Sequence, residues 1–588
     1  MKKLVIIGAG IAGSLAAMYF RKRLPEIDVT LVGRTDRKRP VVGESTVEIT
    51  THFFEALGLG TLLEEKHYHK YGLTYYFKLN AQRDCRRYVV HEAPGVLRMP
   101  AYNLNRNTFD RDIRDINLRL GIQAVEADVA DIQLSAEPAS THRVTLRHSD
   151  GRHSTLDADW VIDATGRNRF LARKLGLARP PAYQRSSFWF RLSRFDRTCL
   201  SNMQKIRVEH HTYDSYYVTH HFYGKGYWVW LIPMRSESGH DLISIGITFR
   251  PEIMGGEVTS MDAFLDVMSN DHPVIAELVR SGSVVDTNLY RNYMYEAEQY
   301  YSEDGWFLIG DAGFTFDPAN SAGLAYLAHQ IPQTAAMIKK DAAGVLTRKY
   351  VECLEAHLRA QLSLQDTWSK WYEFMHEPLK MAWTLLVANL GYFHVSLPNY
   401  VNGAFLDAHQ ARHFADLLPR HSPAHQPPGY PFPCLLDAVA ASHQEIRPEL
   451  LPNLYSRSVN WKLYRADESA RPYYAARYFR MLVLIRFRLL RMVKWKPGLQ
   501  HLSLLSKHLF GAAADAARSL ALCIRPALFY KYGRSPERLA SPFHPGASFL
   551  DCEPHDAALS PPLVHMHDGG DLQRRLIAPN EGEAEGVA

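Results

Sequence analysis

The first part of the chain alternates short apolar runs with helical patterns. Leu4 to Ile7 is an apolar run of strand length, and Leu15, Ala16 and Met18 then recur at the spacing of a helix that buries one face. A second apolar run covers Val29 to Val32. The alternation continues to about residue 170 and resumes near residue 305, which predicts an α/β unit built from two separated segments.

Between about residues 171 and 304 the pattern changes to short β-rich runs, namely SSFWFRL, YYVTHHFY, YWVWLIP and LISIGITF. They predict an antiparallel sheet that forms a substrate wall, and their aromatic content suits a core as well as an aromatic ligand. Long helical patterns follow, interrupted by the proline-rich Pro419 to Pro433. The predicted units are residues 1–170 with 305–345, residues 171–304, residues 346–535, and a flexible tail, residues 536–588.

Composition narrows the class of protein without identifying it. The chain has 588 residues, more than one core needs, and 46% of them are hydrophobic. No uncharged apolar run approaches the roughly 18 residues of a membrane span. The glycine-rich turn after the first apolar run indicates a strand and not a signal peptide, so the cytoplasm is the expected compartment.

Cysteine and histidine spacing argues against a metal. The 6 cysteines lie far apart with no CxxC pair, and the 28 histidines are scattered. We therefore expect reduced thiols, no disulfide framework and no metal site.

Residues 471–534 are strongly basic, with thirteen Lys or Arg against one acid, Asp515. Four arginines share one face of the predicted helix, and two apolar residues lie in or beside that face: Arg477, Arg480, Arg488 and Arg491, with Leu484 and Phe487. Three interpretations stay open: a solvated face, a surface for an acidic partner such as a carrier protein, and a peripheral contact with an anionic membrane. Nucleic acid is not an expected partner, because no known binding module is present.

The segment GAGIAG, from Gly8 to Gly13, has the strand, turn and helix context of a dinucleotide-binding fingerprint. Gly8 permits the tight turn, Gly10 lets the backbone approach a pyrophosphate, and Gly13 lets helix and strand pack closely, with Ile11 and Ala12 beginning the helix. The acid expected after the second strand is missing, because Gly33 and Arg34 stand there. Arg34 leaves open a 2′-phosphate, hence NADPH, or a solvated side chain beside an FAD ribose held from elsewhere.

Two later strands also end in glycine turns, DWVIDATG up to Gly166 and GWFLIGDAG through Gly310 and Asp311. Asp311 can accept a hydrogen bond from a ribityl hydroxyl, and the helix that opens at Ser321 to Gly323 can stabilise negative charge on a flavin ring. In this order the motifs resemble the Rossmann-like FAD-binding scaffold shared by aromatic hydroxylases and flavin-dependent halogenases. Residues 1–170 and 305–345 are then the FAD-binding domain.

Three further features resemble the flavin-dependent halogenases. Trp228, Trp230, Ile232 and Pro233 match their WxWxIP motif, and a second motif, FxPxSxG, is matched by Phe316, Pro318, Ser321 and Gly323. Lys70 resembles the lysine that these enzymes place between flavin and substrate. Lys66 and Lys78 are nearby, and a loop lysine is usually a solvated surface charge.

The resemblance implies a mechanism. Reduced flavin and oxygen give a hydroperoxide that converts chloride or bromide into hypohalous acid, and Lys70 hydrogen-bonds the oxidant or forms a haloamine. The halide is expected near Ser321, Ala322 and Gly323. Trp228 and Trp230, which core packing explains equally well, are expected to separate flavin from substrate with Phe316, Pro318 and Asn320.

Other residues resemble family positions around the cofactor. Glu44, Ser45 and Thr46, in the VGEST segment, resemble the part that lines one side of the flavin. Arg106 resembles the arginine that approaches the FAD phosphates, and a helix-surface arginine is the competing interpretation.

Asn320 departs from the halogenases of free tryptophan, which have a glutamate at the corresponding place. An amide cannot accept a proton at neutral pH. The favoured substrate is therefore an activated ring, a phenol, a pyrrole or a larger indole compound, free or bound to a carrier protein. The resemblance implies FADH2 delivered by a separate flavin reductase, and it leaves a homodimer open.

Two other functions compete with halogenation. A flavin-dependent monooxygenase or NAD(P)H oxidoreductase would give Arg34 a role, and a non-catalytic flavin-binding interaction protein would act through the basic helix. The intact Lys70 and the two motifs favour the halogenase.

Overall fold

The structure of the chain is a computed structural model. It describes residues 1–35, 41–79, 86–91, 101–135, 141–181, 183–207, 214–401, 403–417, 431–452 and 470–524. The predicted flexible tail and most of the predicted loop from Pro419 to Pro433 lie outside these residues.

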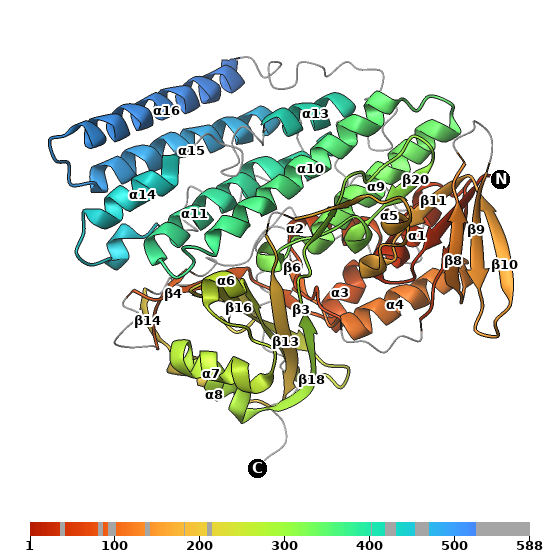
Figure 1. The fold of residues 1–588 in the computed structure, drawn as a ribbon, viewed down its shortest axis with the longest axis horizontal. Helices are drawn as coiled ribbons and strands as arrows, with labels where there is room; N and C mark the ends of the chain where they lie inside the picture. Colours follow the sequence, from red (N-terminus) through yellow and green to blue (C-terminus); the bar gives the residue numbers. More distant parts are fainter. Residues whose placement is uncertain are drawn as a thin grey trace, which may run out of the picture.

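A parallel sheet organises the first unit, at the N-terminal side of the molecule in Figure 1. Four of its five strands are buried on both faces, which explains their largely apolar sequences, whereas the edge strand β7 is mostly exposed. Strand β20, the last of these strands in the sequence, pairs with β11 although about 140 residues separate the two. This pairing brings the two predicted segments together. In order across the sheet the strands are β20 (Trp306–Leu308), β11 (Trp160–Asp163), β1 (Lys3–Ile7), β2 (Asp28–Val32) and β7 (Gln123–Val125).

Helices and small sheets surround this sheet. The helices are α1 (Ile11–Arg23), α2 (Glu48–Ala56), α3 (Gly60–Lys66), α4 (Arg106–Arg119) and α5 (Phe170–Lys174). One antiparallel sheet contains β8 (Asp128–Gln133), β9 (His142–Arg147) and β10 (His153–Ala158). Another contains β12 (Ala178–Arg179), β19 (Tyr295–Ala297) and β21 (Phe314–Thr315), and β3 (Tyr68–Lys70) pairs with β6 (Ala101–Asn103).

The second large sheet has eight strands among the described residues. In order they are β14 (Gln204–Arg207), β5 (Arg87–His91), β4 (Leu73–Phe77), β15 (Thr219–Gly224), β16 (Tyr227–Arg235), β17 (Asp241–Phe249), β13 (Ser186–Ser193) and β18 (Ser283–Tyr290). The four β-rich runs are strands, as predicted. The sheet is not purely antiparallel, because β4 pairs parallel with β15 and β14 pairs parallel with β5. Strands β4 and β5 also come from the segment that the sequence assigned to the first unit.

This sheet separates two cores. The side chains of Phe188, Val229 and Leu231 pack on one face with the helices that cover it. Trp228, Trp230 and Ile232 point to the other face and join the core of the first unit. The alternation of the WxWxI segment therefore directs its motif residues toward the glycine turns. The covering helices are α6 (Pro251–Met254), α7 (Met261–Asp271) and α8 (Pro273–Ser281).

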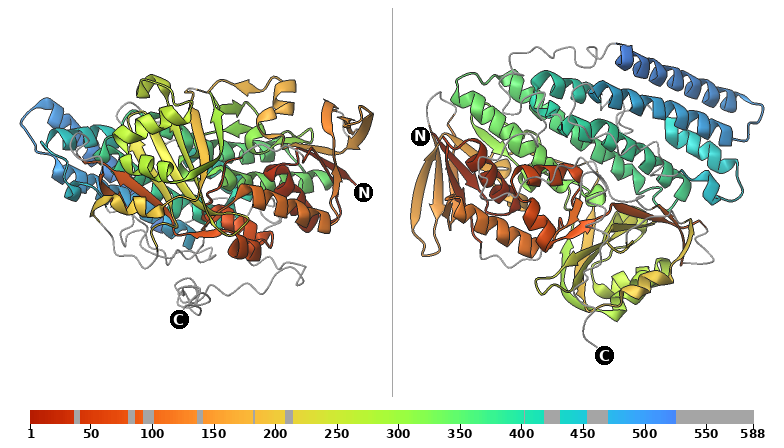
Figure 2. Two further views of the ribbon diagram at one scale, coloured as in Figure 1. Left: turned by 90° about the horizontal axis from the view of Figure 1, so that it is seen from below. Right: turned by 180° about the vertical axis from the view of Figure 1, so that it is seen from behind.

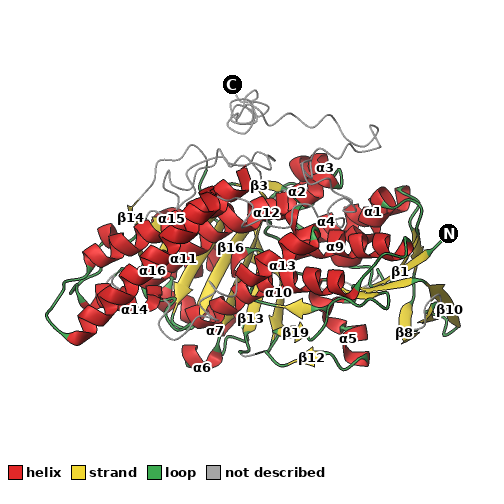
Figure 3. Cartoon of the chain, turned by 90° about the horizontal axis from the view of Figure 1, so that it is seen from above, coloured by secondary structure: helices red, strands yellow, loops and turns green. Residues whose placement is uncertain are grey.

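The remaining helices form a layer along both units, which lies in front of the strands of the second sheet in Figure 3 and behind them in the left view of Figure 2. Those that begin after residue 346 confirm the predicted C-terminal helical region for the residues that the structure describes. They are α9 (Gly323–Ala342), α10 (Arg348–Trp371), α11 (Pro378–Gly391), α12 (Leu397–Val401), α13 (Ala408–Leu417), α14 (Pro431–Ala441), α15 (Ala470–Met492) and α16 (Leu499–Ile524).

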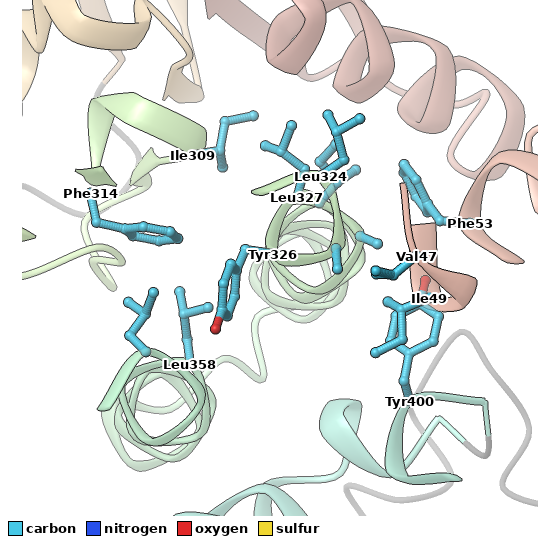
Figure 4. Close-up of a cluster of buried hydrophobic side chains, with 14 of the residues drawn as sticks. Val47, Ile49, Phe53, Ile309, Phe314, Leu324, Tyr326, Leu327, Leu358 and Tyr400 are labelled. Carbon is cyan, nitrogen blue, oxygen red and sulfur yellow. The ribbon is translucent and has the colours of Figure 1, made fainter. Parts of the chain in front are cut away.

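Helix α9 lies at the centre of the molecule, and Figure 4 shows the buried side chains around it. Phe53 packs on one side and Phe314 on the other, while Tyr326 of α9 points toward Leu358 of α10. The Gln330 side chain accepts a hydrogen bond from the Gly310 amide at 2.9 Å and donates one to the Leu308 carbonyl at 3.2 Å. A buried amide that uses both of its ends in this way fixes the turn after β20.

The basic C-terminal helices α15 and α16 pack against each other as an antiparallel pair at the outer edge of the layer (Figure 1). Arg486 is not part of the exposed charge, because its guanidinium is buried and donates to Asp515 at 2.8 and 3.1 Å. Of the four arginines predicted to share a face, Arg480, Arg488 and Arg491 are exposed and Arg477 is half-buried. None of the described helices is long and apolar enough to cross a membrane.

Candidate active site

The turn between β1 and α1 has the geometry that its three glycines predict. Gly8 has a φ of +106°, and a Cβ there would lie 2.3 Å from the Ala164 carbonyl oxygen. A Cβ on Gly13 would lie 1.9 Å from the Gly8 oxygen, so helix and turn are in contact. A Cβ on Gly10 would meet no atom within 4 Å. The open side of the turn therefore coincides with the first amide groups of α1, which have no partner within the helix.

The structure at the end of β2 explains why Gly33 stands where a dinucleotide-binding fold usually has an acidic residue. A Cβ on Gly33 would lie 2.5 Å from the Ala9 amide nitrogen, so no side chain can stand at this position without displacing the glycine turn. Arg34 next to it is half-exposed and lies 3.7 Å from Asp128. The structure thus gives Arg34 a carboxylate neighbour, which weakens the case for a 2′-phosphate.

The turn after β11 is held by its own aspartate. Asp163 is fully buried and accepts hydrogen bonds from the amides of Thr165 at 2.8 Å and Leu171 at 2.7 Å. Its carboxylate is therefore occupied with the turn, and Gly166 at the tip has a φ of +61° with no atom within 4 Å of a Cβ.

Asp311 lies just after β20, and its side chain is accessible to solvent although protein surrounds it. Burial raises the pKa of its carboxyl, and the positive charges of Arg167, Arg169 and Arg106 oppose this effect. Arg167 and Arg169 are held above the rings of Tyr290 and Tyr295, each at 3.8 Å. These two arginines were not predicted from the sequence, and they add positive charge near Asp311, where the cofactor is expected.

Arg106 is not a surface arginine. It begins α4, is 6% exposed, and donates to the Val42 carbonyl at 2.6 Å. Its other nitrogens bind both carboxylate oxygens of Asp110, at 2.7 and 2.8 Å. These contacts fix the arginine beside the VGEST segment and Asp311, and its role at the FAD phosphates stays a prediction.

Lys70, at the end of β3, is 2% exposed. Its Nζ donates to the Ser45 hydroxyl at 2.9 Å and to the Thr46 carbonyl at 2.7 Å. Lys66 is instead half-exposed and paired with Asp112 at 2.9 Å, and Lys78 donates to the Asp271 carbonyl. Of the three neighbouring lysines, Lys70 is therefore the one that contacts the VGEST segment, and the surface-charge interpretation is wrong for it.

The VGEST segment is fixed by strands from elsewhere in the chain. The Ser45 hydroxyl lies 2.7 Å from that of Thr219 on β15. The Thr46 hydroxyl donates to the Tyr102 carbonyl at 2.9 Å and accepts from the Tyr102 amide at 2.8 Å. Glu44 is buried between the charges of Arg106 and Arg191, and burial raises its pKa. The two acceptors of Lys70 are thus held rigidly.

The environment of Lys70 changes its protonation. Burial lowers the pKa of its ammonium to about 7, although the charge of Glu48 acts in the opposite direction. Glu48 begins α2, is 6% exposed, and accepts a hydrogen bond from the Tyr392 hydroxyl at 2.8 Å. Burial also raises the pKa of Glu48. Glu48 was not predicted from the sequence, where the available signal was a second acid four residues beyond Glu44 on the same segment.

Trp228 and Trp230 are both buried, with ring centroids 5.5 Å apart. A Cβ on Gly246, the cross-strand partner of Trp230, would lie 2.2 Å from its indole ring, so the ring lies directly over the glycine. The indole nitrogen of Trp230 donates to the Ser244 hydroxyl at 3.2 Å. The pair therefore forms a fixed aromatic surface, whether it serves packing or separation.

A buried polar chain joins Trp228 to the FxPxSxG segment. The Trp228 indole nitrogen donates to the Tyr372 hydroxyl at 2.9 Å, and that hydroxyl donates to Asp317. Asp317 also pairs with Arg185, Nε to Oδ2 at 3.0 Å, and both side chains are fully buried. Arg185, Asp317 and Tyr372 come from distant parts of the chain and were not predicted.

The FxPxSxG segment ends at the start of α9. Phe316 packs edge-on against Tyr326 at 4.7 Å, and Pro318 opens a tight turn that includes Asn320. Ser321 has a φ of +56°, which turns the chain into α9. Gly323 is exposed, and a Cβ there would meet no atom within 4 Å. With Ala322 it presents the amides of a 20-residue helix, as an anion site requires.

The described residues contain no group of three or more His, Cys, Asp or Glu side chains that could hold a metal ion. The cysteines among them, Cys199, Cys353, Cys434 and Cys523, are free thiols.

Comparisons with known proteins agree on one family. The family model described as tryptophan halogenase matches residues 3–76 and 62–359. The flavin-dependent halogenase chlA of Dictyostelium discoideum is 27% identical over 432 residues, covering 68% of this chain and 70% of that protein. A 1H-pyrrole-2-carbonyl peptidyl-carrier protein chlorinase of Pseudomonas fluorescens is 25% identical over 341 residues, covering 55% of this chain and 72% of that protein.

Among solved structures, halogenase PltM in complex with phloroglucinol and FAD is similar to this chain. The TM-score is 0.56 at 16% identity, covering 87% of this chain and 96% of that one. At this identity the similarity shows the fold, and it confirms the predicted Rossmann-like FAD-binding scaffold with added sheet and helices.

Gly13→Ala is expected to abolish flavin binding, because its Cβ would collide with the Gly8 carbonyl and open the turn. The absorbance of bound flavin per protein after gel filtration measures this. Gly256→Ala is the matched control, since a Cβ there meets no atom within 4 Å. Normal flavin content in Gly13→Ala would refute the assignment of the turn.

Lys70→Met is expected to raise the melting temperature at neutral pH. The folded state lowers the pKa of Lys70 from its ordinary value to about 7, so the unfolded state binds more protons between these two values. The stability cost of Lys70 is therefore fully present below pH 7 and disappears as the pH rises toward the ordinary lysine value. Melting curves of both proteins from pH 7 to 10 should converge, and a constant difference would contradict the lowered pKa.

Proposed function

The chain belongs to the tryptophan halogenase family of flavin-dependent oxidoreductases, and we propose that it halogenates an electron-rich aromatic ring with chloride or bromide, Lys70 delivering the halogen. The observation on which the proposal depends is the buried Lys70, held by the VGEST segment with its pKa lowered to about 7. A lysine in this state is a competent nucleophile at neutral pH.

The residues present fit FAD. The open glycine turn at Gly8 to Gly13 and the cations Arg167 and Arg169 suit the pyrophosphate, and Asp311 is an accessible acceptor for hydroxyl groups. Arg106, Glu44, Ser45 and Thr46 would border the flavin. Bound FAD, once reduced, supplies with dioxygen the oxidising equivalents that convert halide into an electrophile. The amides of Ser321 to Gly323 would hold the halide.

Lys70 controls where the electrophile goes. In its neutral form the amine attacks the halogen of hypohalous acid, a nitrogen–halogen bond forms, and water leaves. The aromatic ring then takes the halogen from the nitrogen and gives up one proton, and the nitrogen gains one proton, which restores the amine. In its ammonium form Lys70 instead donates a hydrogen bond to hypohalous acid, which makes the halogen more electrophilic. A pKa of about 7 makes both forms available at neutral pH.

Glu48 is the base that we propose for the ring proton. Asn320 cannot accept a proton, whereas the buried Glu48 carboxyl interacts with the charge of Lys70 and is oriented by Tyr392. Burial raises its pKa, which makes the carboxylate a better base. Trp228 and Trp230, with Phe316 and Pro318, would separate this chemistry from the flavin.

The substrate class follows from the same residues and from the relatives. An activated ring needs little help from a base, which favours phenols and pyrroles over free tryptophan. One relative is named for a pyrrole carried on a peptidyl-carrier protein, and the PltM structure contains phloroglucinol, a phenol. We therefore place phenols and pyrroles first, with the free and carrier-bound forms to be compared directly. A separate flavin reductase would supply FADH2.

Lys70→Met is expected to lower product formation by about a hundredfold to a thousandfold while flavin binding stays normal. The assay is mass spectrometry of reactions with FAD, a flavin reductase, NADH, oxygen, halide, and free or carrier-bound phenols and pyrroles. Lys66→Met, an exposed neighbour, is the control and should keep full activity. A halogenated product from Lys70→Met at the normal rate would remove the lysine from the mechanism. A product heavier by one oxygen from the unmodified protein would indicate a monooxygenase.

Glu48→Gln is expected to lower the rate by about a hundredfold without changing flavin content or overall structure. The same assay, run from pH 6 to 9, should show that the variant loses the acid limb of the rate profile. Glu55→Gln, on the same helix α2, is the matched control. An unchanged profile in Glu48→Gln would show that another group accepts the ring proton.

A further inference from the structure

Helix α16 has an apolar outer face. Leu499 is 86% exposed, Leu502 68% and Phe510 83%, and Leu509 and Leu520 are also exposed. At about 3.6 residues per turn these five side chains return to one side of the helix. We call them the outer ridge.

The opposite side of α16 is already packed. His508, Ala512, Asp515 and Leu522 are buried, and Asp515 binds Arg486 of α15. The outer ridge therefore lies apart from the face that packs α16 against the rest of the protein. Scattered exposed leucines are ordinary, but here five large apolar side chains recur on one face of a single 26-residue helix.

The exposed charges around the ridge are positive. The connector from α15 to α16 contains Lys494, Trp495 and Lys496, all exposed, immediately before Leu499. Lys507 lies on the flank of the ridge, and Arg491 lies in the last turn of α15. Asp515 is the single acid between residues 470 and 524, and it is buried in its ion pair. No negative charge among these residues offsets the cations.

We propose that the outer ridge and its connector bind an anionic lipid surface. The apolar side chains would enter the boundary between headgroups and acyl chains, and the lysines would contact lipid phosphates. Trp495 has the amphipathic ring that prefers this boundary. The proposal is independent of the halogenation chemistry.

Charge distinguishes this occupant from two others. A second copy of the chain would bring lysines against lysines, which is unfavourable. An acidic carrier protein would match the cations, but it would need a complementary apolar groove along the whole helix. An anionic lipid surface matches the cations and also accepts the apolar side chains, and it needs no preformed groove.

Figures 1 and 2 show α16 at the outer edge of the helical layer, away from the two large sheets. A flat surface can therefore approach α16 without meeting the sheets.

The test is co-sedimentation of the full-length protein with phosphatidylcholine vesicles, with and without phosphatidylglycerol. Binding is expected to require phosphatidylglycerol. Leu499→Asn with Phe510→Asn should weaken it roughly tenfold or more, as should Lys494→Gln with Lys496→Gln. Leu118→Asn, which replaces a leucine 63% exposed on α4, and Lys349→Gln are the matched controls and should bind normally. Melting curves check that every variant is folded.

Three results would overturn the proposal. One is no binding to phosphatidylglycerol vesicles, and another is binding that both double variants retain. The third is sedimentation velocity showing a dimer that Leu499→Asn with Phe510→Asn dissociates, which would assign the ridge to a second copy. If the protein does not bind phosphatidylglycerol vesicles but does bind an acidic carrier protein, the outer ridge is assigned to that partner.

Discussion

The fully buried ion pair between Arg185 and Asp317 constrains the whole active region. A desolvated charge that loses its partner is strongly destabilising, so the segment with Asp317 must stay within reach of Arg185 at the edge of the second sheet. Tyr372 and Trp228 extend the pair into the helical layer and into β16. Since Asp317 precedes Ser321 by four residues, the start of α9 is fixed relative to the tryptophan strand. Three parts of the chain that could otherwise shift independently are thus held in one geometry.

Within that geometry, Lys70 is buried against neutral acceptors. Its described hydrogen bonds go to a hydroxyl and a carbonyl, and the carboxyl group whose charge acts on it, Glu48, accepts a hydrogen bond from Tyr392. A carboxylate in direct contact would keep the amine protonated well above neutral pH, whereas this arrangement lets desolvation dominate. The stability lost by burying the lysine is therefore tied to its usefulness as a nucleophile. Removing the charge should stabilise the fold and remove the chemistry.

Local motifs made much of this site predictable. The glycine turns, Lys70 and the tryptophan pair are each recognisable within a few residues of sequence, and their spacing reflects strand and turn geometry that the structure confirms. Glu48 with Tyr392, and Arg185 with Asp317 and Tyr372, could not be predicted, because the partners are up to 344 residues apart. The second sheet shows the same limit. The segment with β4 and β5 was assigned to the alternating first unit, and only the long-range pairing of β4 with β15 places it in the second sheet.

The basic C-terminal region shows why a count of charges does not define a surface. Its sequence suggested one arginine face, yet Arg486 is buried against Asp515 and Arg488 lies over the Trp383 ring at 5.1 Å. The buried ion pair thus removes Asp515, the single acid between residues 470 and 524, from solvent together with the cation Arg486. The exposed cations that remain are arginines such as Arg480 and Arg491 together with the lysines of the connector. They lie beside large apolar side chains, a combination that the periodicity of the arginines alone could not reveal. The same ion pair that joins α15 to α16 therefore buries the acid and leaves cations and large apolar side chains exposed together on and beside α16.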